Sequence, residues 1–563
     1  MERFGWEAEI KMEQIRPRVS FWGVVAAATL LVIIVAAICW SLRHPYGVHW
    51  DEAQYLNEVA IDTQRLQAGM LLKLGGRILL KSWGRPPAYR LLAVPILALL
   101  GFHTATARLV SLACYGLSAW FIFLATKRIA NEVAGAFAVL VFCLSPQVVS
   151  ASLWFSSEGP LYLATSAMLY YLFSSWTDTS KRPNNWIGLG LAVGLGFLSK
   201  SSFVLIALPV LASGFFVDRW GHLGVSISSS LRKAGTLALL VAGPWWVLNI
   251  KSSIAYAEYA RGFVRNSLGP PSPATWMRWF GTVLESLLGY GLSILIALVV
   301  IAFVRNVIVR RQTTLDAFQK MAFGVCACAG LPIVLAQLSG TNHLLRHISP
   351  AVIPLSILVA VLADSVGWTR SGAGIAVSSI LFCAQLFMIL APVFVPNKHA
   401  VDSGLVNGSL PWRIMVQFDQ WDWGPVLKIG RSCGVDDPRI SYLGSGLAFN
   451  QAQIEYPWAA KGVATDVKWL WRYEDGAIDW QKVMDVAEHS DIVLTAPGYI
   501  RAIADRQDLD NQHNSEFAAH LSRDPRFREP IGLRMGRFEP VEVLVFVNKN
   551  LTCQPPEQAP AVR

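Results

Sequence analysis

The feature that most constrains the fold is a run of uncharged, mostly apolar residues near the start of the chain, residues 21–42. A helix of about 22 residues, rising 1.5 Å per residue, is long enough to cross roughly 30 Å of hydrocarbon. Polar and charged residues precede this run, and no convincing small-residue cleavage pattern follows it. We therefore predict a membrane-spanning helix rather than a signal peptide.

Further apolar stretches indicate that the chain crosses the membrane repeatedly. The segment 86–102 is also apolar, but it is short and carries Arg90, so we expect a re-entrant or interfacial helix there. The sequence predicts a polytopic α-helical membrane protein with about eleven spans. The ten that follow the first are expected at residues 105–126, 133–151, 159–175, 186–199, 201–217, 234–250, 284–304, 321–340, 348–366 and 371–394.

Charge density divides the chain near residue 396. About 12% of residues 1–396 are charged, against about 24% of residues 397–563, which is the soluble average. We predict a transmembrane domain in the first part and a water-facing mixed α/β domain in the second. Its expected elements are β-type runs at 439–443, 491–495 and 541–547 and a helix at 480–487.

Basic residues predict the orientation of the spans. Four of them precede the first span, and further basic residues fall in alternate loops, at 127–128, 181–182, 219–233, 305–320 and 370. The positive-inside rule makes that side cytoplasmic, in what we expect to be the cell's cytoplasmic membrane. The first long loop, 43–88, and the C-terminal domain then lie outside. The net charge of +10 is modest for 563 residues, and we expect no nucleic-acid partner.

Acidic residues are scarce in the membrane part, yet Asp51 and Glu52 follow the first span directly. A carboxylate at a membrane rim can act as a general base or bind a cation. These two acids are equally consistent with a helix N-terminus, where Asp51 caps the helix and Glu52 interacts favourably with the helix dipole. The stretch alone leaves both interpretations open.

The predicted topology brings other ionisable residues to the same rim. Each one alone is typical of an interfacial side chain. Two carboxylate sites and two cationic sites on one face, however, indicate a reaction centre. The further members are Glu158, Lys200, His343, Arg346 and His347.

This mixture of side chains suits displacement at the anomeric carbon of a sugar whose leaving group is a lipid phosphate. A carboxylate deprotonates the incoming hydroxyl, and fixed cations stabilise the charge that builds on the phosphate oxygens. Aromatic residues near this face can stack on sugar rings, although most such residues are ordinary membrane-interface aromatics. The candidates for stacking are Trp50, Tyr55 and Trp154.

The order of short motifs over residues 20–365 resembles the GT-C glycosyltransferases that use polyprenyl-phosphate sugars, such as protein O-mannosyltransferases and lipid A aminoarabinose transferases. The resemblance implies that Asp51 is the catalytic base, with Glu52 beside it, and that Glu158 is the second acid of the site. The motifs are Asp51-Glu52, Arg85-Pro86-Pro87-Ala88-Tyr89, Leu144-Ser145-Pro146 leading to Glu158, Leu198-Ser199-Lys200, and Arg346-His347-Ile348-Ser349-Pro350.

The same resemblance implies that Arg85, Lys200 and Arg346, with His343 and His347, bind the donor phosphate. The family commonly has Lys-Pro-Pro where Arg85 stands, Asp where Glu158 stands and Arg-Tyr where Arg346-His347 stands. Arg85 keeps the positive charge and adds a fork that suits phosphate. The acceptor, whether a membrane lipid, a glycan or a protein, and any need for a divalent metal are left open.

Two alternatives from other classes remain at this point. A transporter or flippase of lipid-linked sugars requires ionisable residues near mid-bilayer, and most of the expected spans have none. A protein that binds sugar lipids without catalysis fits the same residues.

Cys433 and Cys553 are the only cysteines after residue 396. In an oxidising compartment we expect them to form a disulfide, although two such cysteines can also remain unpaired.

Overall fold

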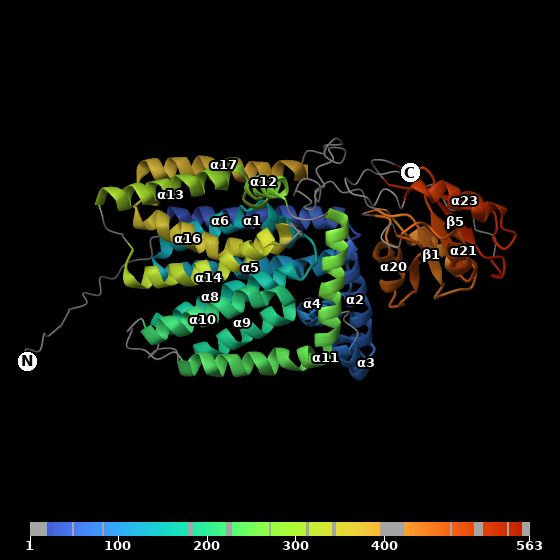
Figure 1. Cartoon of the computed structure of the whole chain (residues 1–563), viewed down its shortest axis with the longest axis horizontal. Helices are drawn as coiled ribbons and strands as arrows, with labels where there is room; N and C mark the ends of the chain where they lie inside the picture. Colours follow the sequence, from blue (N-terminus) through green and yellow to red (C-terminus); the bar gives the residue numbers. More distant parts are fainter. Residues whose placement is uncertain are drawn as a thin grey trace, which may run out of the picture.

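The computed structural model describes most of the chain. Helices α1 to α17 fill the N-terminal part, and a smaller α/β domain follows (Figure 1). The described residues are 20–47, 50–80, 84–177, 184–220, 228–268, 272–310, 315–339, 345–394, 421–446, 448–472, 476–499, 511–536 and 540–553.

The helical domain contains long, mostly apolar helices together with several short ones. Its helices are α1 Phe21–Arg43, α2 Trp50–Gln67, α3 Leu71–Leu80, α4 Ala88–Leu100, α5 Thr104–Ile129, α6 Glu132–Cys143, α7 Pro146–Leu153, α8 Glu158–Thr177, α9 Asn185–Ser199, α10 Val204–Trp220, α11 Ser228–Leu268, α12 Pro273–Thr282, α13 Tyr290–Arg310, α14 Ala317–Ser339, α15 Leu345–Ile348, α16 Val352–Ser365 and α17 Gly372–Phe394.

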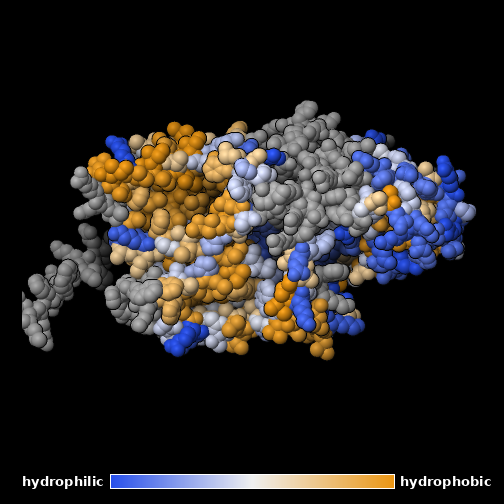
Figure 2. All heavy atoms as spheres, viewed as in Figure 1, coloured by the Kyte–Doolittle hydropathy of each residue, from blue (hydrophilic) through white to orange (hydrophobic). Residues whose placement is uncertain are grey.

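The molecule is a multi-pass membrane protein. Seven helical stretches in the described residues are long and apolar enough to cross a membrane, or eight if the bent pair α6–α7 is one span. The expected count of eleven is therefore not confirmed, because helices such as α9 are apolar but shorter than a full span. On the face shown in Figure 2, hydrophobic residues cover much of the helical domain and mostly hydrophilic ones cover the C-terminal domain.

The break between α6 and α7 sets the direction of α7 and so the position of residues 154–157, which follow it. The two helices bend by 68° at Leu144 and Ser145, where Pro146 begins α7 without a backbone N–H. Helix α7 then ends at Leu153, and residues 154–157 form a buried connection to α8. This connection carries Trp154 and leads directly to Glu158.

Two segments run across the ends of the spans that face the C-terminal domain (Figure 1). One is α2, which lies inside the loop expected at residues 43–88. The other is the last part of α11, whose first part runs parallel to the spans before the helix changes direction. These crossing segments separate the spans from the C-terminal domain and supply much of the candidate site.

The C-terminal domain contains a five-stranded mixed sheet in the order β2-β1-β3-β5-β4. Strands β2, β1 and β3 are parallel, and β5 is antiparallel to both β3 and β4. Of the five strands, β2 and β4 were not expected from the sequence. The elements are α19 Gly424–Ser432, β1 Ile440–Leu443, α20 Gln451–Ala459, β2 Val467–Trp469, α21 Trp480–Glu488, β3 Ile492–Thr495, α23 Asn514–Arg523, β4 Ile531–Met535 and β5 Val541–Val547.

A disulfide joins Cys433, at the end of α19, to Cys553, six residues beyond the end of β5. The bond closes a loop with a sequence separation of 120 residues. In the chain-entropy account, such a cross-link restricts the unfolded chain and so stabilises the folded domain. It therefore ties the end of the described chain to the start of the α/β domain.

Helix α20 docks the C-terminal domain onto α2. Asn57 Nδ2 donates to the carbonyl oxygen of Ala452 at 2.8 Å, and the Tyr456 and Thr104 hydroxyls lie 2.6 Å apart. Gln453 Nε2 donates to the carbonyl oxygen of Gly47, just before α2. Because Gly47 and Asn57 flank Asp51 in the chain, the C-terminal domain helps to fix the helix that carries Asp51.

Candidate active site

Asp51 lies between two arginines that come from distant parts of the sequence. Its Oδ1 is 3.4 Å from Arg85 Nη2, and its Oδ2 accepts a hydrogen bond from Arg346 Nη1. The three side chains are 14–22% exposed, so the cluster is sheltered yet open to a ligand. One carboxylate and two guanidinium groups thus converge at the end of the helical domain that faces the C-terminal domain.

The neighbouring acid, Glu52, points the other way and is fully buried. Arg108 donates to both of its carboxylate oxygens, and the backbone N–H of Phe155 donates to Oε1 at 2.8 Å. Glu52 therefore connects α2 to α5 and to the 154–157 connection. The structure does not bring Glu52 into the Asp51 cluster, and its contacts are with Arg108 and Phe155 instead.

Glu158, at the start of α8, pairs with Lys200 at the end of α9. Lys200 Nζ lies 2.8 Å from Glu158 Oε1, and the Glu158 side chain is only 2% exposed. The Lys200 side chain is 19% exposed, so it is more open to solvent than the carboxylate with which it pairs. The second acid and the second cation expected from the sequence are thus direct partners.

Tyr55 links the two clusters. The Arg85 guanidinium lies 5.5 Å from the centre of its ring, and its hydroxyl lies 3.4 Å from Ser157 Oγ. Ser157 Oγ is in turn 3.4 Å from Glu158 Oε2. A continuous chain of contacts therefore runs from Arg85 to Glu158, and it places Tyr55 between the cations instead of leaving it free to stack on a sugar.

The aromatic candidate Trp154 packs against Arg346, whose guanidinium lies 5.9 Å from the ring centre. His347 is next to Arg346 in α15 and interacts electrostatically with Lys200 and Glu158. The structure thus brings Trp154 and His347 into the site. His343 lies outside the described residues.

Trp50 lies at the junction of the two domains. Its ring centre is 5.4 Å from that of Trp469 in β2. This contact connects the residue before Asp51 to the sheet of the C-terminal domain. The ring that was expected to stack on a sugar therefore packs against another indole.

The other acidic side chains of α2, Glu58 and Asp62, have partners that do not contact Asp51. Asp62 pairs with Arg77 and with Arg90, whose Nε is 2.6 Å from Asp62 Oδ2. Tyr89 donates its hydroxyl hydrogen to Glu58. These contacts fasten α3 and α4 to α2, and Arg90 is completely buried inside the protein.

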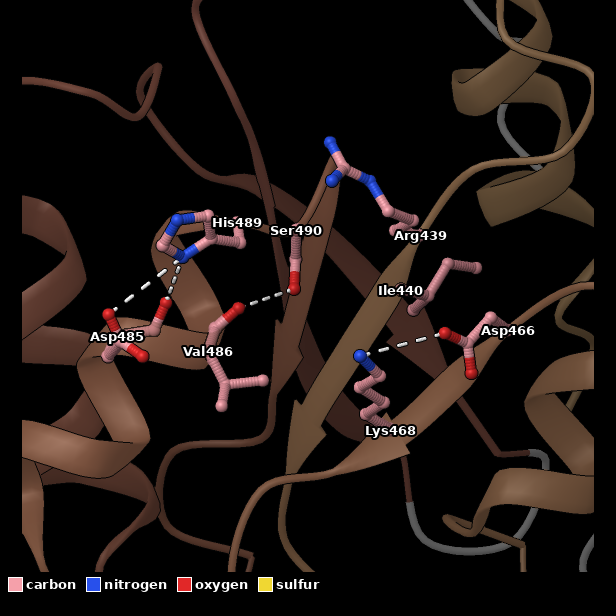
Figure 3. A pocket seen from close by; sticks show the side chains of 8 residues that line it. All are labelled: Arg439, Ile440, Asp466, Lys468, Asp485, Val486, His489 and Ser490. Carbon is pink, nitrogen blue, oxygen red and sulfur yellow. Dashed lines mark hydrogen bonds and ion pairs between the residues drawn. The ribbon is translucent and has the colours of Figure 1, made fainter.

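Within the described ranges, no group of three or more His, Cys, Asp or Glu side chains is arranged to hold a metal ion. A shallow hollow of about 240 Å³ lies elsewhere, on the C-terminal domain (Figure 3). Its basic side chains pair with acidic ones, as Lys468 does with Asp466 at 3.7 Å. It lies at the amino ends of the parallel strands, whereas ligands of such sheets bind at the carboxyl ends. We assign it no role.

Two residues that contact the site, Arg108 and Tyr256, were not identified from the sequence. Arg108 lies in an apolar span, and a charge in such a position is a recognised sign of function. Tyr256 in α11 accepts a hydrogen bond from Arg85 Nη2 at 3.1 Å. No local pattern distinguishes it from the other tyrosines, because only the fold brings it to Arg85.

Comparisons with known proteins find a matching family model and matching folds. The family model for dolichyl-phosphate-mannose-protein mannosyltransferase matches residues 84–248. The undecaprenyl phosphate-alpha-4-amino-4-deoxy-L-arabinose arabinosyl transferase 2 of Pseudomonas fluorescens is 29% identical over 159 residues. That match spans 27% of this chain and 26% of the relative's length.

Solved structures match over much more of the chain. The crystal structure of ArnT from Cupriavidus metallidurans in the apo state aligns with a TM-score of 0.59 and 14% identity, covering 95% of this chain and 99% of that one. Arabinofuranosyltransferase AftD from Mycobacteria aligns with a TM-score of 0.55 and 14% identity, covering 94% of this chain and 40% of its own. The chain thus has the fold of the GT-C glycosyltransferases, and the resemblance expected from its motifs is confirmed.

Proposed function

We propose that the protein is a glycosyltransferase that moves a sugar from a polyprenyl-phosphate donor to an acceptor outside the cytoplasmic membrane. The observation that carries this proposal is the Asp51 carboxylate held between Arg85 and Arg346, beside the Glu158–Lys200 pair. One carboxylate able to accept a proton and three cations able to bind a phosphate match the needs of such a transfer.

In the proposed reaction, Asp51 accepts the proton of an acceptor hydroxyl. The hydroxyl oxygen attacks the anomeric carbon, and the bond between that carbon and the phosphate oxygen breaks. The phosphate leaves with the bonding electrons, and Arg85, Arg346 and Lys200 stabilise its growing negative charge. Phosphate is a good leaving group, so this step needs no acid catalyst.

The ion pairs around Asp51 imply an order of binding. Asp51 shares its two oxygens with Arg85 and Arg346, so in this state its lone pairs are engaged. A donor phosphate offers more negative charge to the same guanidinium groups and draws them toward itself. Donor binding would therefore release Asp51 for the acceptor hydroxyl, which favours donor first and acceptor second.

The comparisons support a lipid-phosphate donor. A second structure of the Cupriavidus protein, which aligns with a TM-score of 0.56, 15% identity and coverage of 95% of this chain and 99% of that one, is described as bound to undecaprenyl phosphate. The Pseudomonas relative is named for an undecaprenyl-phosphate-linked aminoarabinose. For this chain we propose the same class of donor lipid, with a membrane glycolipid, an envelope glycan or a protein as acceptor.

We further propose that the N-terminus is cytoplasmic and that the site and the C-terminal domain are extracytoplasmic. The placement of basic residues supports this orientation. The disulfide between Cys433 and Cys553 also supports it, because such bonds persist in oxidising compartments.

The test is a deletion of the gene in its native host, complemented by the wild-type chain or by Asp51→Asn. We expect mass spectrometry to find one envelope glycan or glycolipid lost in the deletion strain, with its lipid-linked sugar accumulated. Wild type restores the product, and Asp51→Asn, present at the same level in the membrane, does not. Full restoration by Asp51→Asn would instead favour a transporter or a binding protein, whose activity needs no general base.

A further inference from the structure

The last part of α11 is pressed against the segment that carries Arg85. Ser253 Oγ donates to the carbonyl oxygen of Gly84 at 3.1 Å, and Gly84 has a φ of +73°. A Cβ at Gly84 would lie 2.6 Å from the carbonyl oxygen of Ser252. Only glycine suits this contact, because it tolerates positive φ and leaves room for the backbone of α11. The residue before Arg85 therefore rests directly on α11.

One helical turn further along, Tyr256 holds the Arg85 side chain itself. Its hydroxyl accepts from Arg85 Nη2 at 3.1 Å, and its ring centre lies 5.2 Å from the guanidinium carbon. Tyr55 lies against the same guanidinium group at 5.5 Å. Arg85 is thus held by two tyrosine rings while the same Nη2 reaches Asp51 at 3.4 Å.

Three residues after Tyr256, the same helix contacts the C-terminal domain. The Tyr259 hydroxyl accepts from Arg472 Nη1 at 2.7 Å. The Arg472 guanidinium in turn lies 4.9 Å from the ring centre of Trp469, which packs against Trp50. Because Trp50 precedes Asp51, the C-terminal domain reaches the site from two sides, through α11 and through the start of α2.

We propose that residues 251–259 of α11 form a strap that positions Arg85 for the donor phosphate and couples this position to the C-terminal domain. Tyr256 is the positioning residue, and Tyr259 with Arg472 is the connection to the C-terminal domain. The inference rests on the proposed function, because it assigns Arg85 to the donor phosphate. Without the Tyr256 hydroxyl, Arg85 loses this hydrogen bond and keeps its contacts with Asp51 and the Tyr55 ring, so its guanidinium group is held less firmly for an incoming phosphate.

The experiment measures binding of undecaprenyl phosphate, and separately of undecaprenol, to the purified full chain in lipid nanodiscs. We expect Tyr256→Phe to weaken undecaprenyl phosphate binding about fivefold, the size of effect that a typical intramolecular hydrogen bond has. Undecaprenol, which lacks the phosphate, should bind equally to both proteins. Tyr290→Phe, at an exposed tyrosine on α13, is the matched control and should bind like wild type.

The coupling is tested by a double-mutant cycle between Tyr256→Phe and Arg472→Ala. Mutations at sites that do not interact have additive effects. The strap predicts that Arg472→Ala weakens undecaprenyl phosphate binding in wild type and has little further effect in Tyr256→Phe. Tyr259→Phe removes the same hydrogen bond with a smaller change to the side chain. If Arg472→Ala does not fold, Tyr259→Phe takes its place in the cycle and the same result is expected. Arg431→Ala, at an exposed arginine of the C-terminal domain, is the control.

Three results would overturn the strap. Equal undecaprenyl phosphate binding by wild type and Tyr256→Phe, or strictly additive effects in the cycle, removes the strap and leaves the proposed transferase intact. Failure of wild type to bind undecaprenyl phosphate at all removes the donor assignment and the strap with it. The two failures are therefore distinguishable.

Discussion

Arg108 and Glu52 form a two-point ion pair inside the protein, with Nε 2.8 Å from Oε1 and Nη2 2.9 Å from Oε2. Neither side chain is exposed. Arg108 also donates to the carbonyl oxygens of His44 and Tyr46, which lie between α1 and α2. The pair therefore fixes the start of α2, where Asp51 lies next to Glu52 in the chain.

Breaking this pair should destabilise the protein and disorder the site. Arg108→Ala leaves the Glu52 carboxylate buried without its cation, which typically costs about 3–5 kcal/mol. We expect a lower thermal unfolding midpoint in nanodiscs. Lys127→Ala breaks the exposed pair with Glu132 and should cost no more than about 1 kcal/mol. Equal midpoints for the two variants would show that the buried pair contributes little.

Asp51→Asn tests the general base. The substitution keeps the shape of the side chain and removes its charge and basicity, so transfer should fall by about 10²–10⁴-fold. Arg85 and Arg346 lose their carboxylate partner, so undecaprenyl phosphate should bind as tightly as to wild type or more tightly. Transfer assays and binding measurements on the same preparation separate the two effects. Near-normal transfer would remove Asp51 from the mechanism.

The sequence predicts which residues form the site better than it predicts how they are held. Alternation of loops across the membrane is enough to place Asp51, Glu158, Lys200 and Arg346 at one end of the spans. The contact between Asn57 and Ala452 joins residues 395 positions apart, and no periodicity encodes it. Apolar runs predict where helices form, whereas the packing of one helix on another depends on the shapes of side chains.

The sequence likewise predicts only some of the strands of the C-terminal domain. Strands β1, β3 and β5 are apolar runs and were expected from the sequence. Strand β2 has only three residues. Strand β4 alternates half-buried and exposed positions before the buried Met535, and it includes Arg534, so neither strand resembles a buried strand in the sequence. Their pairing depends on neighbours elsewhere in the sheet, which a local pattern cannot reveal.

Lys200 has two possible roles that mutation can separate. Lys200→Met leaves the buried Glu158 carboxylate unpaired, so a loss of activity could come from Glu158 alone. The double variant Lys200→Met with Glu158→Gln removes both charges together. If Lys200 stabilises the leaving phosphate, we expect the turnover rate to stay low in the double variant as well. Recovery of the turnover rate would reduce Lys200 to a counter-ion of Glu158.

Glu455, on α20, makes the docking of the C-terminal domain sensitive to pH. Its carboxylate accepts from Gln451 Nε2 at 2.8 Å and lies 3.4 Å from Asn57 Nδ2 on α2. Burial raises the pKa of Glu455 from 4.5 to about 7, with smaller contributions from the negative charges of Asp466 and Glu58. The docked interface therefore favours the protonated, neutral form of this side chain.

The sign of the pH effect follows from this pKa. A carboxyl group whose pKa is higher in the docked state binds more protons there than when it is exposed. Docking stability from Glu455 is fully present below about pH 4.5, falls as the pH rises, and reaches its lower level above about pH 7. Hydrogen exchange of the α20 backbone amides, corrected for the intrinsic pH dependence of exchange, should show protection that declines across this range. Glu455→Gln, which cannot ionise, should hold its protection constant, whereas Asp466→Asn at an exposed neighbour should behave nearly like wild type. If Glu455→Gln loses protection over the same pH range as wild type, a different group controls the docking.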